Sequence, residues 1–339
     1  MLDKILESLY LKVFVNIVVQ RTKTVVYIEL RSKKEIIEEE TVEFNTTALN
    51  NEMYNFILRY AKESPYYYIS IVDCSAFQGA LPTCEKNKFS DYKDLSTAQY
   101  KCFENKWVFY TSKNDIYELE KKYEDVGLDF IFSPFVILQN FFKDKINGNL
   151  AMYVLVQDGF ISVSMFENSQ LLYAEHLEVL TGDDTDDILL NDEMDENMDL
   201  DEGIDLEDID VEENDIEDLD DFGDIEDLDA LEDIDEFSQS KDVEEELQES
   251  LDTLPEAEED ESFNEDYQRF TLIQSAVAHF YKDEKYESHF IENVYISDCI
   301  GVTSDLKKYL EEEMFFNVYV RQADLAVEVC ELAKMELGL

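Results

Sequence analysis

Positive charge is scarce in this sequence. Its 27 Lys and Arg residues stand against 82 Asp and Glu residues, which gives a formal net charge of −55 at pH 7 over 339 residues. A negative field of this size repels nucleic acids and anionic membrane surfaces. We therefore exclude DNA, RNA and lipid headgroups as primary ligands, and we expect contact with a membrane only indirectly, through a partner protein.

Long hydrophobic runs are absent as well. A membrane-spanning helix needs about 20 consecutive apolar residues, and the longest apolar runs, such as KVFVNIVV, fit the strands of a sheet instead. The sequence does not open with the pattern of a signal peptide. These two features predict a cytoplasmic protein.

Cysteine and histidine are too few and too scattered to indicate a metal site. None of the five cysteines forms a C-x-x-C pair, and the three histidines occur singly. Cys74, Cys84 and Cys102 have a spacing unlike that of zinc fingers and lack a fourth ligand. An odd number of cysteines fits a reducing compartment, so we expect free thiols and no metal.

Apolar residues are nevertheless abundant, at 45% with 13% aromatics, which is enough to fill folded cores. The negative charge is concentrated in Asp183–Asp266, whose 43 acidic residues and single lysine carry −42 and leave −13 for the rest. Ile and Leu recur there every three or four residues, but repulsion within so dense a charge run opposes a helix. We expect this segment to be a long disordered insertion.

The remaining sequence shows one pattern twice. The segments VFVNIVV, TVVYIEL and EETVEF predict an antiparallel meander, followed by a helix over Leu49–Ala61 and the strand YYYISIVD. A second meander begins at Tyr153, and after the acidic segment helices alternate with strands, beginning with a helix over Tyr267–Tyr281. This repetition predicts a duplicated α/β fold of two lobes. The predicted boundaries are a first lobe at 1–73 and 107–148, a small inserted subdomain at 74–106, a second lobe at 149–182 and 267–339, and the acidic insertion at 183–266.

Three stretches carry a resemblance to a known family. They are WVFYTSKNDIYELEKKYEDVGLDFIFSPFVILQNFF, MYVLVQDGFISVSMFENSQLLYAEHL, and the segment that runs from IQSAVAHFYK to FFNVYV. Their joint order resembles the actin-like (ASKHA-fold) family that includes the type IV pilus protein PilM and the cytoplasmic domain of the type II secretion protein GspL. The resemblance covers Lys12 to about Leu337 outside the acidic insertion. It implies two lobes of mixed sheets flanked by helices, equivalent to subdomains 1A and 2A, with a small 1C-like insertion at 74–106.

The resemblance also implies where a nucleotide would lie. In the family, two hairpin turns with an Asp-x-Gly pattern and a Gly-Gly pair after a late strand surround the phosphates, and carboxylates organise Mg²⁺. Carried over, the nucleotide-binding residues would be Asn16 or Gln20 in the first hairpin, Asp158 and Gly159 in the second, and Asp298 and Gly301 after the late strand.

The match to these nucleotide motifs is degenerate. The first hairpin, VNIVVQRTKTVV, has no glycine and no acid, Asp158 and Gly159 are adjacent rather than spaced, and Asp298-Cys299 replaces the glycine pair. We therefore expect no catalytic residue and no cofactor, and ATP with Mg²⁺ is the ligand to test. The alternative interpretation is that Asp158-Gly159 is an ordinary hairpin turn pair and that Asp298 is a capping acid.

The resemblance implies a non-enzymatic scaffold at the cytoplasmic face of the inner membrane. Such a scaffold grips the cytoplasmic segment of a bitopic, PilN-like inner-membrane protein, contacts a motor ATPase or ring neighbours, and self-associates. The gripping groove would lie between the strands of Lys12–Asp73 and the inserted 74–106. The envelope-spanning machine is left open: a type IV pilus, a type II secretion or DNA-uptake apparatus, or a flagellar-motor ring. Two alternatives remain, an actin-like ATPase and an acidic, chaperone-like binder of a basic partner.

Overall fold

The computed structural model describes residues 10–33, 35–179, 261–283, 290–302 and 304–339. In the helix Glu261–Phe280 it describes side chains from residue 265 onward. With the exception of Glu261, these residues belong to one unit, formed by Met1–Thr181 and Ser262–Leu339. The predicted disordered insertion covers 183–266, and its residues 183–260 lie outside the described part of the chain. No helix in the described ranges is long and apolar enough to cross a membrane.

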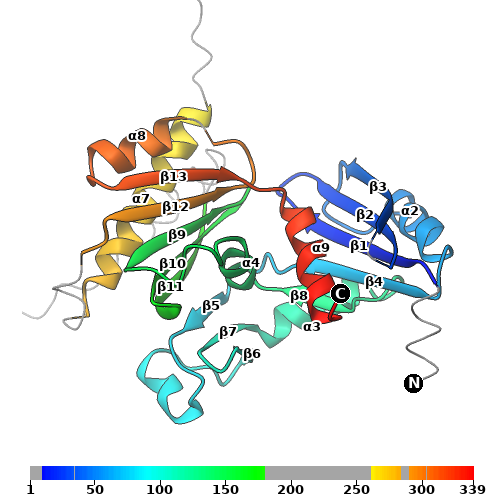
Figure 1. The fold of residues 1–339 in the computed structure, drawn as a ribbon, viewed down its shortest axis with the longest axis horizontal. Coiled ribbons are helices and arrows are strands. Elements are labelled where there is room, and N and C mark those ends of the chain that lie inside the picture. Colours follow the sequence, from blue (N-terminus) through cyan, green and yellow to red (C-terminus); the bar gives the residue numbers. More distant parts are fainter. Residues whose placement is uncertain (1–9, 34, 180–260, 284–289, 303) are drawn as a thin grey trace, which may run out of the picture. The chain divides into compact units, whose positions relative to one another are not determined.

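The first part of the chain forms a five-stranded sheet in the order β3-β2-β1-β4-β8 (Figure 1). The pairs β1–β2 and β2–β3 are antiparallel, whereas β4 is parallel to β1 and β8 is parallel to β4. The predicted meander is therefore confirmed, and it continues into a parallel half. The strands are β1 (Lys12–Val19), β2 (Thr24–Ser32), β3 (Glu35–Phe44), β4 (Tyr66–Val72) and β8 (Phe130–Phe132).

Both faces of β1 are buried because each face has its own helical cover. Val13, Val15 and Ile17 alternate onto the face covered by helix α2 (Asn51–Ala61). Phe14 and Val18 belong to the core on the opposite face. Helix α2 begins where the Asn50 side chain accepts the backbone N–H of Met53 at 2.8 Å, as a helix cap of this residue type does.

The second sheet repeats the first. Its order is β11-β10-β9-β12-β13, with an antiparallel meander β9–β10–β11 and with β12 and β13 parallel to β9. Helices α7 (Glu261–Phe280) and α8 (Ser304–Glu312) supply apolar residues to the core on one face. The prediction of a duplicated, two-lobed α/β fold with mixed sheets flanked by helices is confirmed. The strands are β9 (Ala151–Val156), β10 (Phe160–Glu167), β11 (Gln170–Glu178), β12 (Asn293–Asp298) and β13 (Asn317–Gln322).

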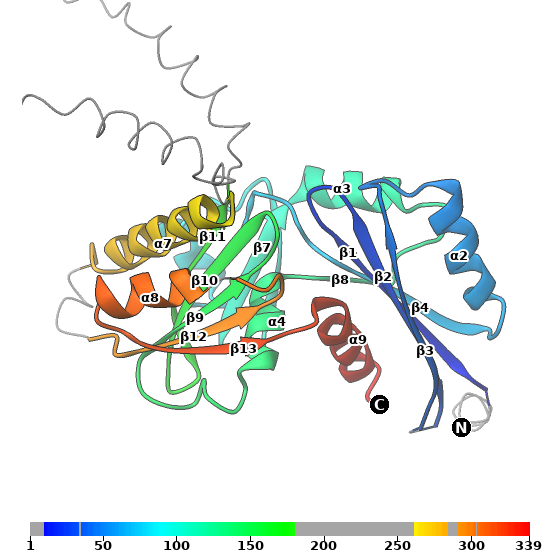
Figure 2. The same cartoon turned by 90° about the horizontal axis from the view of Figure 1, so that it is seen from above.

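Two helices cross between the lobes. Helix α4 (Pro134–Phe141), which follows β8 of the first sheet, contacts β9 and β10 of the second. Helix α9 (Leu325–Glu336), which follows β13 of the second sheet, contacts β1, β2 and β4 of the first (Figures 1 and 2). There the buried Lys334 ammonium lies 3.1 Å from the Glu29 carboxylate of β2. Each lobe is therefore completed by a helix whose sequence follows the other lobe's sheet.

A small antiparallel sheet in the order β5-β7-β6 follows β4. Strand β7, which the sequence analysis places in the first lobe beyond residue 106, pairs with β6 along its whole length and with β5 over Val108–Thr111. The small subdomain thus extends past its predicted boundary. The strands are β5 (Gln78–Leu81), β6 (Ala98–Phe103) and β7 (Trp107–Ser112), and helix α3 (Lys113–Lys122) follows.

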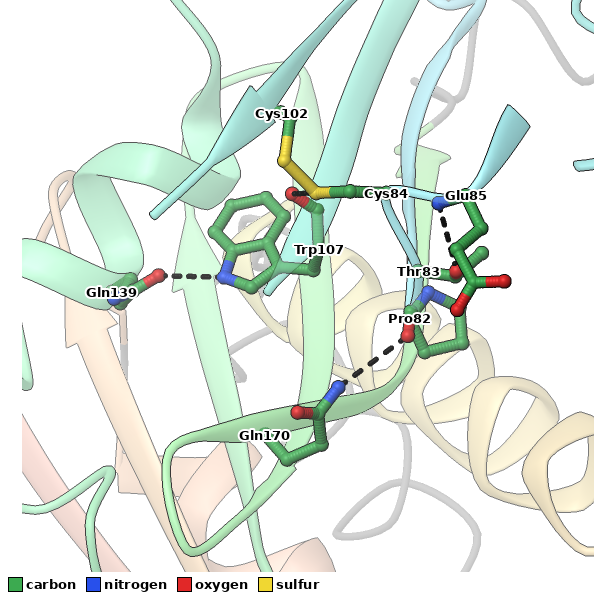
Figure 3. The surroundings of a disulfide bond; sticks show 8 residues. All are labelled: Pro82, Thr83, Cys84, Glu85, Cys102, Trp107, Gln139 and Gln170. Atoms are coloured by element: carbon green, nitrogen blue, oxygen red, sulfur yellow. Dashed lines mark hydrogen bonds between the residues drawn. A yellow bond between two sulfur atoms is a disulfide. The ribbon is translucent and has the colours of Figure 1, made fainter. Parts of the chain in front are cut away.

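A disulfide bond joins Cys84 to Cys102 in this subdomain (Figure 3). The expectation of free thiols is therefore wrong for these two residues. The chain between them folds back so that their Cα atoms lie 5.6 Å apart, within the range that a disulfide spans. Cys74, Cys299 and Cys330 are free.

Helix α7 begins earlier than the sequence pattern indicated. It was predicted from Tyr267, whereas the structure starts it at Glu261, so Glu265 and Asp266 belong to the helix and not to the insertion. Asp266 is fully buried and accepts a hydrogen bond from Arg269 at 2.8 Å. Acidic residues are favoured in the first turns of a helix, and that preference explains why an apparent charge run continues into a folded element.

Candidate functional site

A cleft of about 630 Å³ lies at the carboxyl ends of the central strands of both sheets. From the first sheet it receives the end of β1 with the following turn, and Cys74 after β4. The second sheet supplies the turn between β9 and β10, and the segment after β12. The beginning of α9 closes one side. This is the place where the family resemblance predicts a nucleotide.

The structure brings some of the predicted nucleotide-binding residues together and separates others. Gln20, Asp158 and Gly159 line the cleft. Asp298 is fully buried, directly before Cys299 and Ile300, which do line it. Gly301 is exposed beyond them. Asn16 lies in the middle of β1, is fully buried, and donates from Nδ2 to the carbonyl of Tyr27 at 3.3 Å, so it is not at the cleft.

The carboxylate of Asp158 is already engaged inside the protein. Its Oδ2 accepts the backbone N–H of Arg21, in the turn after β1, at 2.9 Å. A backbone N–H in this turn is the kind of donor that would face a phosphate oxygen in a nucleotide site. Here one such donor is occupied by a carboxylate of the opposite lobe.

Gly159 is not required by close packing. A Cβ added there would meet Arg21 Cγ at 3.5 Å, which is an ordinary van der Waals contact. Backbone hydrogen bonding from Gln157 N–H to the Phe160 carbonyl at 2.9 Å closes a two-residue loop that holds Asp158 and Gly159. Neither Asp158 nor Gly159 has a positive φ, so the pair forms a two-residue hairpin turn that differs from the type I′ turn Asp-Gly usually adopts.

Asp298 fills an anion-binding turn. Its Oδ1 accepts the backbone N–H groups of Ile300, Gly301 and Val302 at 3.1, 2.8 and 3.1 Å. Gly301 has φ +79°, a left-handed conformation that glycine adopts at no steric cost. Successive N–H groups converging in this way form a nest for an anion. In this chain the anion is the protein's own carboxylate, and Gln322 Nε2 donates to its other oxygen at 2.5 Å.

Arg21 lines the cleft, and the sequence analysis did not single it out. Its guanidinium donates to Glu265 Oε1 at 2.9 Å and to the carbonyl of Val179 at 2.6 Å. The first-lobe hairpin is thereby bonded to the segment that follows β11 and to helix α7, in addition to Asp158. A basic residue in a hairpin turn of so acidic a sequence was the available signal, and its partners become apparent only in three dimensions.

A second cavity, a groove of about 760 Å³, lies beside the small sheet. Strand β6, which pairs only with β7 among the described strands, lines one wall, and β8, which pairs only with β4, lines another. Helices α3, α4 and α9 also line it. Of the wall predicted from Lys12–Asp73, Asp73 alone reaches the groove, since β8 lies between β4 and the groove.

Apolar side chains from several elements face the groove, with polar groups at its rim. They include Phe103 of β6, Phe130 of β8, Val136 of α4, and Leu332 with the half-exposed Met335 of α9. Beneath Phe103 the ring of Trp107 stacks at a centroid distance of 5.0 Å. Trp107 Nε1 in turn donates to Gln139 Oε1 at 2.9 Å (Figure 3), which holds α4 against the small sheet.

His176 joins the small sheet to the second sheet. Its Nδ1 lies 2.8 Å from Ser162 Oγ, and its Nε2 lies 3.3 Å from the amide nitrogen of Gln78. The same amide nitrogen of Gln78 donates to the carbonyls of Asp73 and Ser75 at 3.0 and 2.8 Å, which fixes the start of β5 beside the imidazole. Burial lowers the pKa of His176 to about 4.

This buried imidazole makes the stability of the fold depend on pH. The pKa in the folded protein is below the ordinary value of 6.5, so between these two values the unfolded chain binds the proton and the folded chain does not. The contribution of the neutral His176 ring to the free energy of unfolding is full above pH 6.5 and is lost as the pH falls toward 4. We expect the free energy of unfolding to fall by about 1–3 kcal/mol over this range through His176.

Chemical denaturation of the wild type and of His176→Gln at several pH values measures this effect. The variant keeps polar contacts but does not titrate, so its curve should be flatter than that of the wild type. His279→Gln, at a side chain that is 40% exposed, controls for the loss of a histidine as such. Identical pH profiles for wild type and His176→Gln would contradict the prediction.

Comparison with models of known families shows which family the chain belongs to. A model of the family described as domain of unknown function (DUF8341) matches residues 152–338, more than half of the sequence. The chain belongs to the DUF8341 family. The model of a second family, domain of unknown function (DUF8569), matches residues 10–139. No curated protein matches the chain.

Solved structures similar to this DUF8341 protein include three that span nearly its whole length. A Bacteroides thetaiotaomicron protein with an actin-like ATPase fold and unknown function is 14% identical, with a TM-score of 0.43, over 94% of this chain and 96% of its own. The PilM–PilN type IV pilus biogenesis complex is 8% identical, with a TM-score of 0.43, over 91% and 87%.

The third similar structure is the activator of the 2-hydroxyisocaproyl-CoA dehydratase from Clostridium difficile with bound ADPNP. It is 10% identical to the DUF8341 chain, with a TM-score of 0.41, over 96% of this chain and 98% of its own. At sequence identities this low, neither the activity nor the partner of a similar structure can be assigned to this chain.

Proposed function

We propose that this protein is a non-enzymatic scaffold whose groove holds an extended segment of a partner protein. The observation that carries the proposal is the groove itself. It is lined by β6 and β8, each of which has one edge that no described strand pairs with. Extended peptides bind proteins by adding a strand to such edges while their side chains enter adjacent pockets. Its volume of about 760 Å³ is in the range of peptide and ligand sites.

The groove suits a segment with apolar side chains and few charges. Its walls carry aromatic and aliphatic side chains, and the charges at its rim are of both signs. Lys101 of β6, for example, lies 3.6 Å from Glu336 of α9. An apolar segment gains from burial against these walls, while main-chain hydrogen bonds to β6 or β8 fix its direction. We infer that the partner segment is extended and apolar.

The state of the cleft supports a role without catalysis. Donors that would face nucleotide phosphates are occupied by the carboxylates of Asp158 and Asp298. A bound nucleotide would have to displace these groups and bring its own negative charge close to theirs, which is unfavourable at short range. The proposed scaffold therefore works without ATP or Mg²⁺.

The class of partner comes from the sequence resemblance to PilM and GspL. On that basis the groove would hold the cytoplasmic segment of a bitopic, PilN-like inner-membrane protein. The scaffold would then sit in the cytoplasm at the inner face of the membrane, near a motor ATPase or ring neighbours. The machine would be a type IV pilus, a type II secretion or DNA-uptake apparatus, or a flagellar-motor ring.

Site-specific photo-crosslinking in the native cell tests the groove. A photoreactive amino acid at Met335, inside the groove, should yield a crosslink to a membrane-embedded protein, through that protein's cytoplasmic segment. The same amino acid at Ile37, which is 57% exposed on β3, is the matched control and should not. A crosslink to the same protein from both positions, or from neither, would refute the groove as the binding site.

Isothermal titration with ATP and Mg²⁺ tests the absence of a nucleotide role. We expect no binding heat at millimolar ATP for the wild type. Binding at micromolar affinity that Asp158→Ala abolishes would instead show a live phosphate site and favour an actin-like ATPase. A partner that binds the purified protein but is released at high salt would favour the acidic, chaperone-like role, since about 1 M salt screens charges beyond about 3 Å.

A further inference from the structure

Strand β13 is the outermost strand of the second sheet, with β12 as its neighbour (Figure 1). Asn317 N–H bonds to the Glu292 carbonyl and Ala323 N–H bonds to the Asp298 carbonyl, so the odd-numbered residues of β13 turn toward β12. Residues alternate in a strand. The backbone groups of Val318, Val320 and Gln322 therefore point outward, where no described strand pairs with them.

The other long sheet edges carry acids that oppose pairing with a further strand. Strand β3 presents five glutamates and β11 presents Glu175 and Glu178. Proteins commonly protect edge strands with such charges. Strand β13, with the sequence NVYVRQ, has no acidic residue and no proline, and its Tyr319 and Val320 are 50% and 39% exposed.

Exposed aromatic side chains extend this surface past the start of the strand. Phe315 is 81% exposed and has φ 59°, a left-handed conformation that is unfavourable for a bulky residue. Phe290, just before β12, is 71% exposed. Since β12 and β13 are parallel, both rings lie at the same end of the sheet. Strain and apolar exposure together at one place indicate an interaction surface.

We propose that a second copy of this chain pairs with β13 in antiparallel fashion about a two-fold axis. The outward-pointing N–H and C=O groups belong to the even-numbered residues of β13. The two-fold axis must therefore place even-numbered residues of the two copies opposite each other. With the axis at Val320, this residue faces its own copy, Val318 faces Gln322, and Tyr319 faces Arg321. The two five-stranded sheets then form one continuous ten-stranded sheet, joined by main-chain hydrogen bonds.

The charges of the strand favour an identical partner over a charged one. Arg321 is its one ionised side chain, and the guanidinium is held by both oxygens of Asp144, at 3.0 and 2.9 Å. In the proposed register it meets Tyr319 rather than another arginine, so no like charges oppose each other. An edge without free charge offers nothing to select a basic or acidic foreign strand.

The net charge of the chain predicts how this dimer responds to salt. Two chains of −55 repel each other, whereas strand pairing and apolar contact are short-range. Raising the salt from about 0.1 M to about 1 M shortens the Debye length from about 10 Å to about 3 Å. Dimerisation should therefore strengthen with salt, opposite to the behaviour of a dimer held by ion pairs.

Sedimentation velocity of the full chain tests the proposal, from about 1 to about 100 µM at both salt concentrations. We expect a reversible dimer of twice 39.7 kDa. Val320→Glu places two carboxylates face to face and should raise the dissociation constant at least about tenfold. Ile37→Glu adds the same charge to the β3 edge and should leave it unchanged.

A second variant isolates the main-chain pairing. Val320→Pro removes the outward N–H without breaking a hydrogen bond to β12 and should also weaken the dimer, while thermal unfolding checks that the fold persists. A monomer of 39.7 kDa under all conditions would overturn the proposal. So would a dimer that Val320→Glu leaves intact, or one that Ile37→Glu weakens equally.

Discussion

Replacing Lys334 with methionine should lower the free energy of unfolding by about 3 kcal/mol or more. The side chains of Lys334 and Glu29 are only 4% and 2% exposed, and the ammonium contacts both carboxylate oxygens, at 3.2 and 3.1 Å. Removing Lys334 leaves the buried Glu29 carboxylate with Arg31, 3.2 Å away, in place of two cationic partners, and losing a partner inside the protein costs far more than losing one on the surface. Because Lys334 is on α9 and Glu29 is on β2, the substitution should also loosen α9 from the first sheet.

A double-mutant cycle separates the pair from the packing. Adding Glu29→Gln to Lys334→Met removes the stranded charge and should recover much of the loss, with a coupling energy well above 1 kcal/mol. Lys23→Met breaks an ion pair whose partners are 36% and 56% exposed, and should cost less than about 1 kcal/mol. Urea denaturation of Lys334→Met, Glu29→Gln, the double variant and Lys23→Met measures these differences. Additive losses at residues 29 and 334 would show that the pair is not coupled.

Replacing Asp298 with alanine should also lower the free energy of unfolding by about 3 kcal/mol or more. Three backbone N–H groups and Gln322 Nε2 would lose a buried acceptor, and hydrogen bonds to a charged group contribute about 1.5–3 kcal/mol each. Part of the loss is offset where water enters the turn. Denaturant titration of the purified variant measures the effect.

The same variant should respond to inorganic phosphate. With the carboxylate gone, the nest of Ile300, Gly301 and Val302 is open to an external anion, and a ligand that binds only the folded state stabilises it. We expect added phosphate to raise the unfolding free energy of Asp298→Ala more than that of the wild type. Asp94→Ala, which removes an exposed acceptor from Ser96 N–H, controls for general salt effects. Equal responses in all three proteins would contradict the self-filled nest.

Much of the fold could be predicted because its strands carry local signals. The β-branched runs of β1, β2 and β9 and the polar turns between them depend on neighbouring residues alone. The pairing of β7 with β5 and β6, and the three-residue β8, depend on contacts between distant segments. The disulfide was missed for the same reason, since it requires Cys84 and Cys102 to approach in space. Cysteine spacing along the chain does not encode that approach.

The structure brings some of the predicted nucleotide-binding residues together in one cleft, but the contacts that each residue makes depend on the three-dimensional fold. Gln20, Asp158 and Gly159 do line it. Asn16 does not, because the strand continues past it and buries its side chain. That Asp298 accepts three N–H groups follows from the turn with Gly301 at φ +79°, and a sequence shows neither the turn nor the bonds.

The exchange of helices has a consequence for synthesis on the ribosome. Strands β1 to β4 emerge early, but α9, which covers one face of their sheet, comes from residues 325–336. The contact between Glu29 and Lys334 joins residues 305 positions apart. The first lobe therefore remains unfinished while the acidic segment and the whole second lobe are translated. We expect the nascent chain to rely on a chaperone until α9 is released, and its folding to be slow, as for other folds dominated by distant contacts.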